Sequence, residues 1–295
     1  MSEPAPDAAL AALLAAAQRL ETPCGDGVMV WHAWGPEGDA PPVVLLHGGS
    51  GSWTHWVRTI GPLAAAGRRV LVPDLPGFGD SALPPTGEGD ADALIAPLSV
   101  GLAQLTGGVA CDLVGFSFGG MTAGMMLAAH PALARRLVLV GAPAMGVTPK
   151  RLFELKGWRH LPTAASQEVV HRHNLTVLML HDAALIDGLA LQLHVANVMR
   201  DRMPRRRLSS TDILARSLRQ VHCPVHAIYG AHDALYRGWM DALEAAFVAS
   251  APDFRGMTRI AGAGHWVQFE APAAFMAALT TALSAPLNPR SAPAG

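Results

Sequence analysis

Residues 111–121 read CDLVGFSFGGM, and this stretch decides the fold. An apolar run ends at Phe116, Ser117 follows, and a segment rich in methionine and alanine comes next. Gly115 and Gly119 stand two positions before and two positions after the serine. A strand that turns sharply into a helix strains the residue at its apex, and small neighbours prevent clashes there. The pattern predicts a strand–turn–helix unit that exposes the Ser117 hydroxyl at the carboxyl edge of a sheet.

The rest of the chain repeats the alternation of apolar run and helical segment. Short apolar runs that end at glycine or proline occupy residues 28–34, 42–49, 68–77, 111–117, 135–143, 223–233 and 255–265. Runs such as VVLLH and LVLVG lack polar alternation, which is typical of parallel strands that are buried on both faces. We therefore predict an α/β protein with a doubly wound, mostly parallel sheet. Residues 7–20 are expected to form an outer helix.

Residues 147–212 interrupt this alternation. They carry helical patterns of leucine, methionine and histidine and then a run of arginines, with no clear strand. We expect a helical cap inserted into an α/β core made of residues 1–146 and 213–295. A length of 295 residues suits one core with such an insertion.

Composition narrows the possible partners and the compartment. The formal net charge is −1, so nothing suggests binding to nucleic acid or to an anionic membrane. The three cysteines are far apart in the chain and form no CxxC pair, which favours free thiols over a disulfide framework. The first residues lack the pattern of a secretory signal. We expect a cytoplasmic protein that acts on a small molecule, and the sequence leaves a homo-oligomer open.

Two further loops supply partners for the serine. His265 lies in GAGHW, a glycine-flanked loop after the last predicted strand, where a neutral imidazole can accept a proton. Asp233 lies in GAHD after the strand VHAIY, and its carboxylate can fix the tautomer of that imidazole. Their order along the chain, Ser117, Asp233 and His265, is that of α/β-hydrolase triads. A serine activated in this way attacks carbonyl carbons.

The loop His47–Gly51, read HGGSG, follows the strand VVLL. Such a loop can aim a backbone N–H at an oxyanion that develops beside the nucleophile. We expect Gly49 to provide one donor and the amide of Phe118 the second. Ser50 could add its hydroxyl or its own amide.

Taken together, these segments resemble the α/β-hydrolase superfamily over nearly the whole chain. The resemblance rests on HGGSGSW, PDLPGFGDS, GFSFGG, GAHD and GAGHWVQFE. It implies nucleophile Ser117, acid Asp233, base His265 and a helical cap at residues 147–212. It also implies that Asp74 and His47 shape loops and take no part in proton transfer.

Within the superfamily, HGGSGSW and GHWVQFE resemble the hydrolases that cleave carbon–carbon bonds in ring-fission products of aromatic degradation. Two departures are HGGSGS in place of HGGGPG, and Phe116 in place of an asparagine before the nucleophile. Plain esterases, cofactor-free perhydrolases of the haloperoxidase kind and a non-catalytic ligand receptor remain alternatives. Members with an aspartate nucleophile do not fit, because position 117 is serine. The proposed chemistry requires no metal and no organic cofactor.

The substrate is expected to be small and largely apolar. Leucine and methionine in the insertion indicate an apolar pocket roof, which Phe116 and Trp266 would help to line. Arg200 is our candidate partner for a substrate carboxylate. Trp53, His55 and Trp56 are expected to pack around the pocket. The pair His171 and His173 is expected to lie on the surface, because two histidines alone make a poor metal site.

Overall fold

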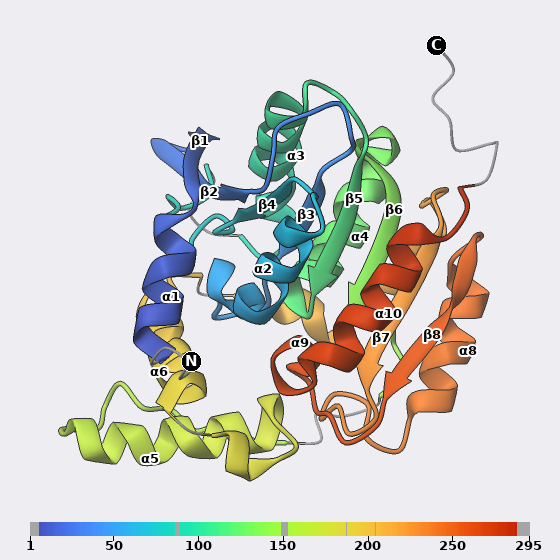
Figure 1. Cartoon of the computed structure of the whole chain (residues 1–295). Helices are drawn as coiled ribbons and strands as arrows, with labels where there is room; N and C mark the ends of the chain where they lie inside the picture. The colour runs from blue at the N-terminus through green and yellow to red at the C-terminus, as the bar shows by residue number, and fades with distance from the viewer. Residues whose placement is uncertain (1–5, 86–88, 149–152, 187, 204, 288–295) are drawn as a thin grey trace.

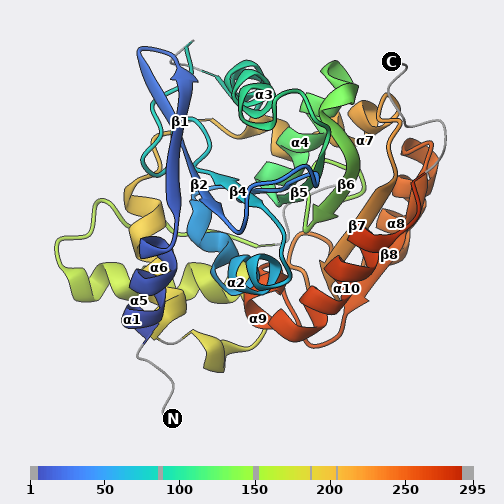
Figure 2. The same cartoon turned by 45° about the horizontal axis from the view of Figure 1, so that its top comes forward.

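A computed structural model describes residues 6–85, 89–148, 153–186, 188–203 and 205–287. It contains one eight-stranded sheet in the order β1-β2-β4-β3-β5-β6-β7-β8. The strands are β1 (Gln18–Cys24), β2 (Gly27–Trp34), β3 (Val43–Leu46), β4 (Val70–Pro73), β5 (Cys111–Phe116), β6 (Ala134–Val140), β7 (Val225–Gly230) and β8 (Phe254–Ile260). From β4 to β8 across the sheet all neighbours are parallel, whereas β2 runs antiparallel to β1 and to β4. The predicted sheet is confirmed, and Figures 1 and 2 show β1 and β8 at its two edges.

Helices cover both faces of this sheet (Figure 1). One face carries α3 (Asp92–Thr106), α4 (Phe118–Ala129), α7 (Ile213–Leu218) and α8 (Met240–Ser250), and the other carries α2 (Val57–Ala65), α9 (Val267–Glu270) and α10 (Pro272–Ser284). The run VVLL in β3 shows why the strands lack polar alternation. Val44 and Leu46 belong to the core on the first face, and Val43 and Leu45 belong to the core on the second.

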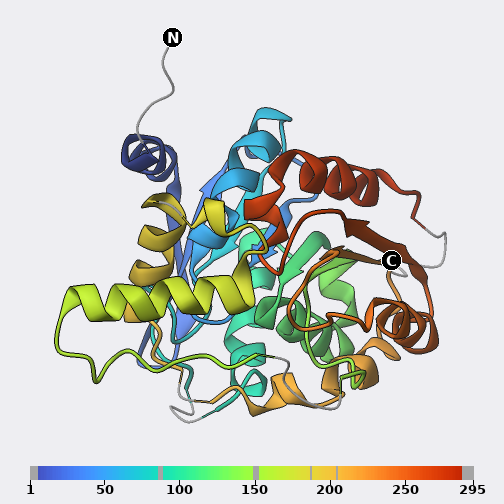
Figure 3. The ribbon, with the colours of Figure 1, turned by 90° about the horizontal axis from the view of Figure 1, so that it is seen from below.

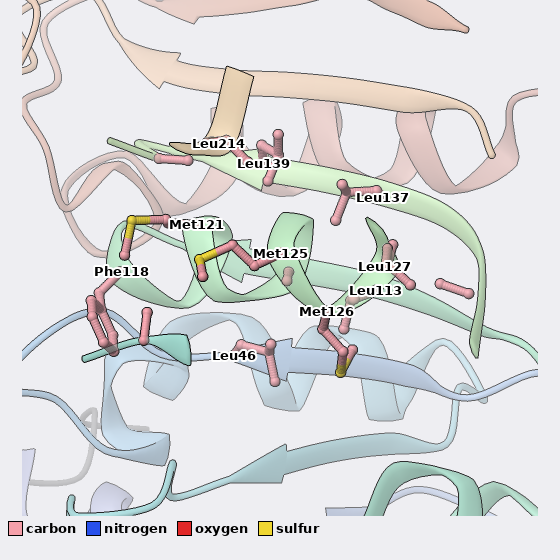
Figure 4. Packing of buried hydrophobic residues seen from close by; sticks show 14 of the residues in the cluster. Leu46, Leu113, Phe118, Met121, Met125, Met126, Leu127, Leu137, Leu139 and Leu214 are labelled. Carbon is pink, nitrogen blue, oxygen red and sulfur yellow. The ribbon is translucent and has the colours of Figure 1, made fainter. Parts of the chain in front are cut away.

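The helix that follows Ser117 is the most deeply buried of the core helices. In α4 the side chains of Met121, Met126 and Leu127 are fully buried, and they pack against leucines of β3, β5 and β6 (Figure 4). A fully buried leucine or methionine stabilises the fold by about 1.5–3 kcal/mol relative to exposure. This packing fixes α4, and therefore the turn at Ser117, against the sheet.

The amino-terminal prediction was partly wrong. Helix α1 (Pro6–Ala15) ends early, and the residues from Gln18 onward form β1, whose seven residues all pair with β2. The strand was missed because it lies at the edge of the sheet and carries exposed polar side chains, among them Arg19 and Glu21. The three cysteines are free thiols, as expected, and all three are buried.

The described part of residues 147–212 contains helices and no strand. They are α5 (Ala164–Asn174), the π-helical turn η3 (Leu175–Met179), the short turns η4 (Ala183–Leu185) and η5 (Arg207–Ser210), and α6 (Gly188–Met199). Figure 3 shows α5 and α6 in front of the sheet, on the side where the parallel strands end. Helix α5 begins at a capping box in which Thr163 and Ser166 bond each other's backbone N–H.

Candidate active site

Ser117 lies at the apex of the turn between β5 and α4. Its backbone has φ 50° and ψ −120°, a conformation that is strained for a residue with a side chain. A Cβ atom at Gly119 would lie 2.4 Å from the His47 carbonyl oxygen, and one at Gly115 would lie 2.6 Å from the Gly120 Cα. Both glycines are therefore required by backbone that passes within contact distance. The strand–turn–helix prediction is confirmed.

The structure brings the three predicted triad residues together. His265 Nε2 lies 2.9 Å from Ser117 Oγ, and His265 Nδ1 lies 2.9 Å from Asp233 Oδ2 and 3.0 Å from Oδ1. Asp233 is fully buried, and its Oδ1 also accepts a hydrogen bond from the Leu235 backbone N–H at 2.9 Å. A buried carboxylate on one side and a hydroxyl on the other form a relay along which a proton can pass from serine to histidine.

Gly141, which directly follows β6, packs against this relay. Its φ is +55°, and a Cβ atom there would lie 3.1 Å from the His265 ring and 3.2 Å from Asp233 Oδ2. Both distances are below ordinary van der Waals contact. The sequence analysis did not single out Gly141, although its place directly after a buried strand was a usable signal.

The HGG loop lies against the turn at Ser117. Gly48 sits so close that a Cβ atom there would lie 2.9 Å from the Phe116 ring and 3.2 Å from Ser117 Cβ. Phe118 is the first residue of α4, so its backbone N–H has no acceptor within the helix. Gly49 and Phe118 both line the cavity described below, next to Ser117. Both expected donor residues therefore line the same cavity as Ser117.

Two neutral imidazoles hold the HGG loop. His47 Nε2 accepts the Leu75 N–H at 2.9 Å, so Nδ1 carries the proton and donates it to the Gly48 carbonyl at 2.8 Å. His55 Nδ1 accepts the Gly48 N–H at 3.2 Å. Burial lowers the pKa of His47 and lowers that of His55 well below its usual range. Both rings stay neutral, which is what these hydrogen bonds require.

Asp74 supports the same region. It is fully buried and accepts hydrogen bonds from the backbone N–H groups of Trp53 and Asp80, both at 2.9 Å. Burial raises the pKa of this carboxyl group. These contacts agree with the loop-shaping role that the resemblance implied for Asp74 and His47.

A cavity of about 1110 Å³ opens above Ser117 and His265. The HGG loop and the turn at Ser117 form its floor, and residues within 143–148, 153–160, 174–179, 194–203 and 206–211 contribute to its walls. Phe116 and His55 line it, as does Leu178 of the insertion. Apolar residues with a few convergent polar groups are typical of small-molecule sites.

Two of the expected substrate-contacting residues do not line the cavity. Trp266 is buried, and its indole N–H donates to the His55 backbone oxygen at 3.0 Å, so its role is packing. Arg200 points to the surface and pairs with Asp80. Arg206, six residues further along, lines the cavity instead. Sequence reasoning could not separate the two, because no regular helix fixes the direction of their side chains.

Ser50 lines the cavity but its hydroxyl hydrogen is already engaged. Ser50 Oγ donates to Asp201 Oδ2 at 2.6 Å and accepts from Arg206 Nη1 at 2.9 Å. The hydroxyl therefore bonds residues 201 and 206, and a contribution from the Ser50 backbone N–H to an oxyanion site stays a prediction.

The prediction that His171 lies on the surface is wrong. It is buried against the ring of Trp158, with 4.9 Å between ring centroids, and against His194 at 5.3 Å. Within the described ranges, no three His, Cys, Asp or Glu side chains converge as metal ligands. Across the same part of the chain, no helix has both the length and the apolar character needed to cross a bilayer.

The sheet is mostly parallel, and a serine, a histidine and an aspartate are in contact at its carboxyl edge. This arrangement is typical of α/β serine hydrolases. A family model matches residues 43–278, and the chain belongs to the family that it describes, the alpha/beta hydrolase family.

Among curated relatives, the chain is 31% identical over 170 residues to 2-hydroxy-6-oxo-6-phenylhexa-2,4-dienoate hydrolase of Burkholderia cepacia. It is 30% identical over 169 residues to 2-hydroxy-6-oxononadienedioate/2-hydroxy-6-oxononatrienedioate hydrolase of Comamonas testosteroni. Each match spans 56% of this chain and 58% of the relative.

Among solved structures, a carboxylesterase from Bacillus subtilis superimposes with a TM-score of 0.75 over 95% of both chains, at 20% identity. A structure described as a putative aryl esterase from Burkholderia cenocepacia gives a TM-score of 0.73 at 23% identity, covering 91% of this chain and 100% of that one. At these identities the likeness concerns the fold.

Proposed function

We propose that the protein is a serine hydrolase in which Ser117, His265 and Asp233 act as a catalytic triad. The observation that carries this proposal is the continuous contact from Asp233 through His265 to Ser117 at the floor of the cavity. Three side chains from three separate loops meet within hydrogen-bond distance. The substrate bond is an ester or the carbon–carbon bond of a vinylogous diketone.

The first half of the reaction forms an acyl-enzyme. Ser117 Oγ attacks the carbonyl carbon while His265 Nε2 takes its proton, and the Asp233 carboxylate accepts a hydrogen bond from Nδ1–H and stabilises the imidazolium. The negative charge moves to the carbonyl oxygen, where the backbone N–H groups of Gly49 and Phe118 stabilise it. The tetrahedral intermediate collapses as His265 returns the proton to the leaving group.

Water completes the cycle. His265 takes a proton from water, the hydroxide attacks the acyl carbon, and Ser117 leaves as a hydroxyl after protonation by His265. In carbon–carbon cleavage the leaving group is a stabilised carbanion, so the proton is delivered to carbon. The same groups serve both reactions.

Residues 147–212 act in this proposal as a cap over the cavity. Side chains from this segment form much of the cavity wall above Ser117. Backbone also joins it to the catalytic histidine loop, because the Trp266 N–H donates to the Met179 carbonyl at 2.7 Å.

Charges on the cavity wall favour a substrate with a carboxylate. Lys156, Arg159, Arg202 and Arg206 line the cavity, and the only acid among the described lining residues is Asp201, which pairs with Arg206. A cleft lined by one sign of charge raises the local concentration of the opposite sign. Relatives that are dienoate hydrolases by name point to the same class of substrate.

The test is Ser117→Ala with a panel of short esters, long esters, lactones and a ring-fission dienoate. We expect kcat to fall by roughly 10⁴-fold or more with the fold intact, because members of a triad act as a unit. Ser284→Ala, at the exposed end of α10, is the matched control and keeps full activity. Mass spectrometry of fluorophosphonate-treated protein should locate the label on Ser117. Full turnover by Ser117→Ala would refute the triad, and labelling without turnover would favour a ligand receptor.

A further inference from the structure

The segment that departs from the family's HGGGPG pattern makes a hydrogen-bonded contact with the insertion. Ser50, Ser52 and Thr54 each bond to α6 or to the residues just after it. We call this set of contacts the clasp. It consists of Ser50, Ser52, Thr54, Asn197, Asp201 and Arg206.

One half of the clasp is an ion pair built around Ser50. Arg206 pairs with Asp201, and the Ser50 hydroxyl lies between them, 2.6 Å from Asp201 Oδ2 and 2.9 Å from Arg206 Nη1. The second carboxylate oxygen of Asp201 accepts the Met203 backbone N–H at 3.1 Å. Both carboxylate oxygens of Asp201 therefore have hydrogen-bond partners.

The other half is a buried amide. Asn197 of α6 is 3% exposed, and its Oδ1 accepts the Ser52 hydroxyl at 2.7 Å while its Nδ2 donates to Thr54 Oγ1 at 3.0 Å. A buried amide with both ends bonded fixes the spacing of the chain that it bonds. Alternate residues of the loop are thus held from one side by the insertion.

The clasp acts on the backbone that carries a proposed oxyanion donor. Ser50 has φ +49°, a left-handed conformation that is strained for a residue with a side chain. Gly49 comes directly before it. The Arg206 side chain lies 3.5 Å from the position of a Cβ atom at Gly49, and its guanidinium lies 6.0 Å from the Phe118 ring centroid. Arg206 therefore lies close to Gly49 and at the outer limit of cation–π range from the Phe118 ring.

From this geometry we propose that Asp201 and Asn197 are positioning residues: Asp201 holds Ser50 in its left-handed conformation, and Asn197 holds the same loop at Ser52 and Thr54, so that the Gly49 N–H is aimed at the oxyanion. The proposal rests on the proposed function, because it assigns a use to the oxyanion site of that reaction. It makes the insertion part of the catalytic framework, in addition to its place over the cavity.

The test compares Asp201→Ala with Asp80→Ala. Each change removes an aspartate that forms an ion pair with an arginine of the insertion. Asp201 pairs with Arg206 at the cavity, whereas Asp80 pairs with Arg200 outside it. We expect Asp201→Ala to lower kcat by about 10- to 100-fold, as misplacement of a catalytic group by up to 1 Å does. KM should change little. Asp80→Ala should match the wild type.

A second measurement is the affinity for a boronic acid, which forms a tetrahedral adduct on serine. A residue that only helped the cap to close would not change this affinity. We expect the boronate to bind Asp201→Ala more weakly by the same factor as the loss in kcat/KM. Asp201→Asn retains an acceptor for Ser50 and should recover part of the activity. Ser50→Gly removes the hydroxyl but tolerates φ +49°, so it folds and should show a loss in kcat of similar size.

The outcomes separate the two proposals. If Ser117→Ala loses turnover while Asp201→Ala and Ser50→Gly keep the wild-type kcat, or raise KM alone, the positioning role is wrong and the triad stands. If Ser117→Ala keeps turnover, the proposed function itself fails.

Discussion

Replacing Gly141 by alanine tests the triad geometry from the side of the scaffold. Gly141 has φ +55°, and so the change has two separable effects, one on the backbone and one on the relay. Gly107, the residue after α3, has φ +59° and no atom within 4 Å of the position of an added Cβ. Gly107→Ala therefore carries the backbone effect without the contact.

The backbone effect should be similar in both variants. An alanine in the left-handed region costs about 1–2 kcal/mol. A loss of 1 kcal/mol lowers the Tm of a large domain by about 2–4 °C. Differential scanning calorimetry should therefore give comparable decreases for Gly107→Ala and Gly141→Ala.

The contact effect should appear only in Gly141→Ala. The added methyl would lie 3.1 Å from the His265 ring and 3.2 Å from Asp233 Oδ2, against an ordinary contact of about 3.5–4.0 Å. His265 must then retreat by a few tenths of an ångström from its 2.9 Å contacts. Since a displacement of about 1 Å can cost 100-fold, we expect kcat to fall by roughly 10-fold.

Steady-state kinetics on the preferred ester, normalised by fluorophosphonate titration of active sites, measures this difference. Gly107→Ala should retain the wild-type kcat. Equal kcat values for the two alanine variants would refute the reasoning, because the close packing of Gly141 on the relay would then be irrelevant to proton transfer.

Two further predictions concern protonation. Asp233→Asn should lower kcat by about 10⁴-fold with little change in Tm. An amide that donates to Nδ1 of His265 leaves the ring hydrogen on Nε2, and Nε2 then cannot accept the proton of Ser117. A loss below 10-fold would contradict the assignment of Asp233 as the acid. The free energy of unfolding, measured by urea titration, should fall as pH drops from 6.5 towards 4. Burial lowers the pKa of His32 and of His194 to about 4, so only the unfolded chain binds these protons in that range. His194→Gln should flatten the dependence, and an unchanged slope would exclude His194 as a contributor.

Much of the active site left local signals in the sequence. Ser117, Asp233 and His265 each follow an apolar run and have a glycine within three residues, because the end of a buried parallel strand must turn sharply without clashes. The same rule gave the HGG loop. The core strands were predictable because burial on both faces demands continuous apolar runs.

Other parts left no such signal. The edge strand β1 has too few buried side chains to show a pattern, and the direction of Arg200 and Arg206 depends on irregular backbone after α6. Ser50 and Ser52, the loop residues that bond Asp201 and Asn197, lie more than 140 residues away from them along the chain. Contacts of this kind arise from packing, so no local pattern encodes them.

The sequence alone therefore determined which turns follow which strands, and with them the identity of the three relay residues. Tertiary structure alone decided how those turns are held: Gly141 against the relay, two neutral imidazoles against Gly48, and the insertion against the Ser50 loop. The physical reason is the separation along the chain of the residues that interact. A turn is dictated by the steric needs of a few neighbouring residues, whereas the support of a loop depends on side chains that meet only when distant elements pack together.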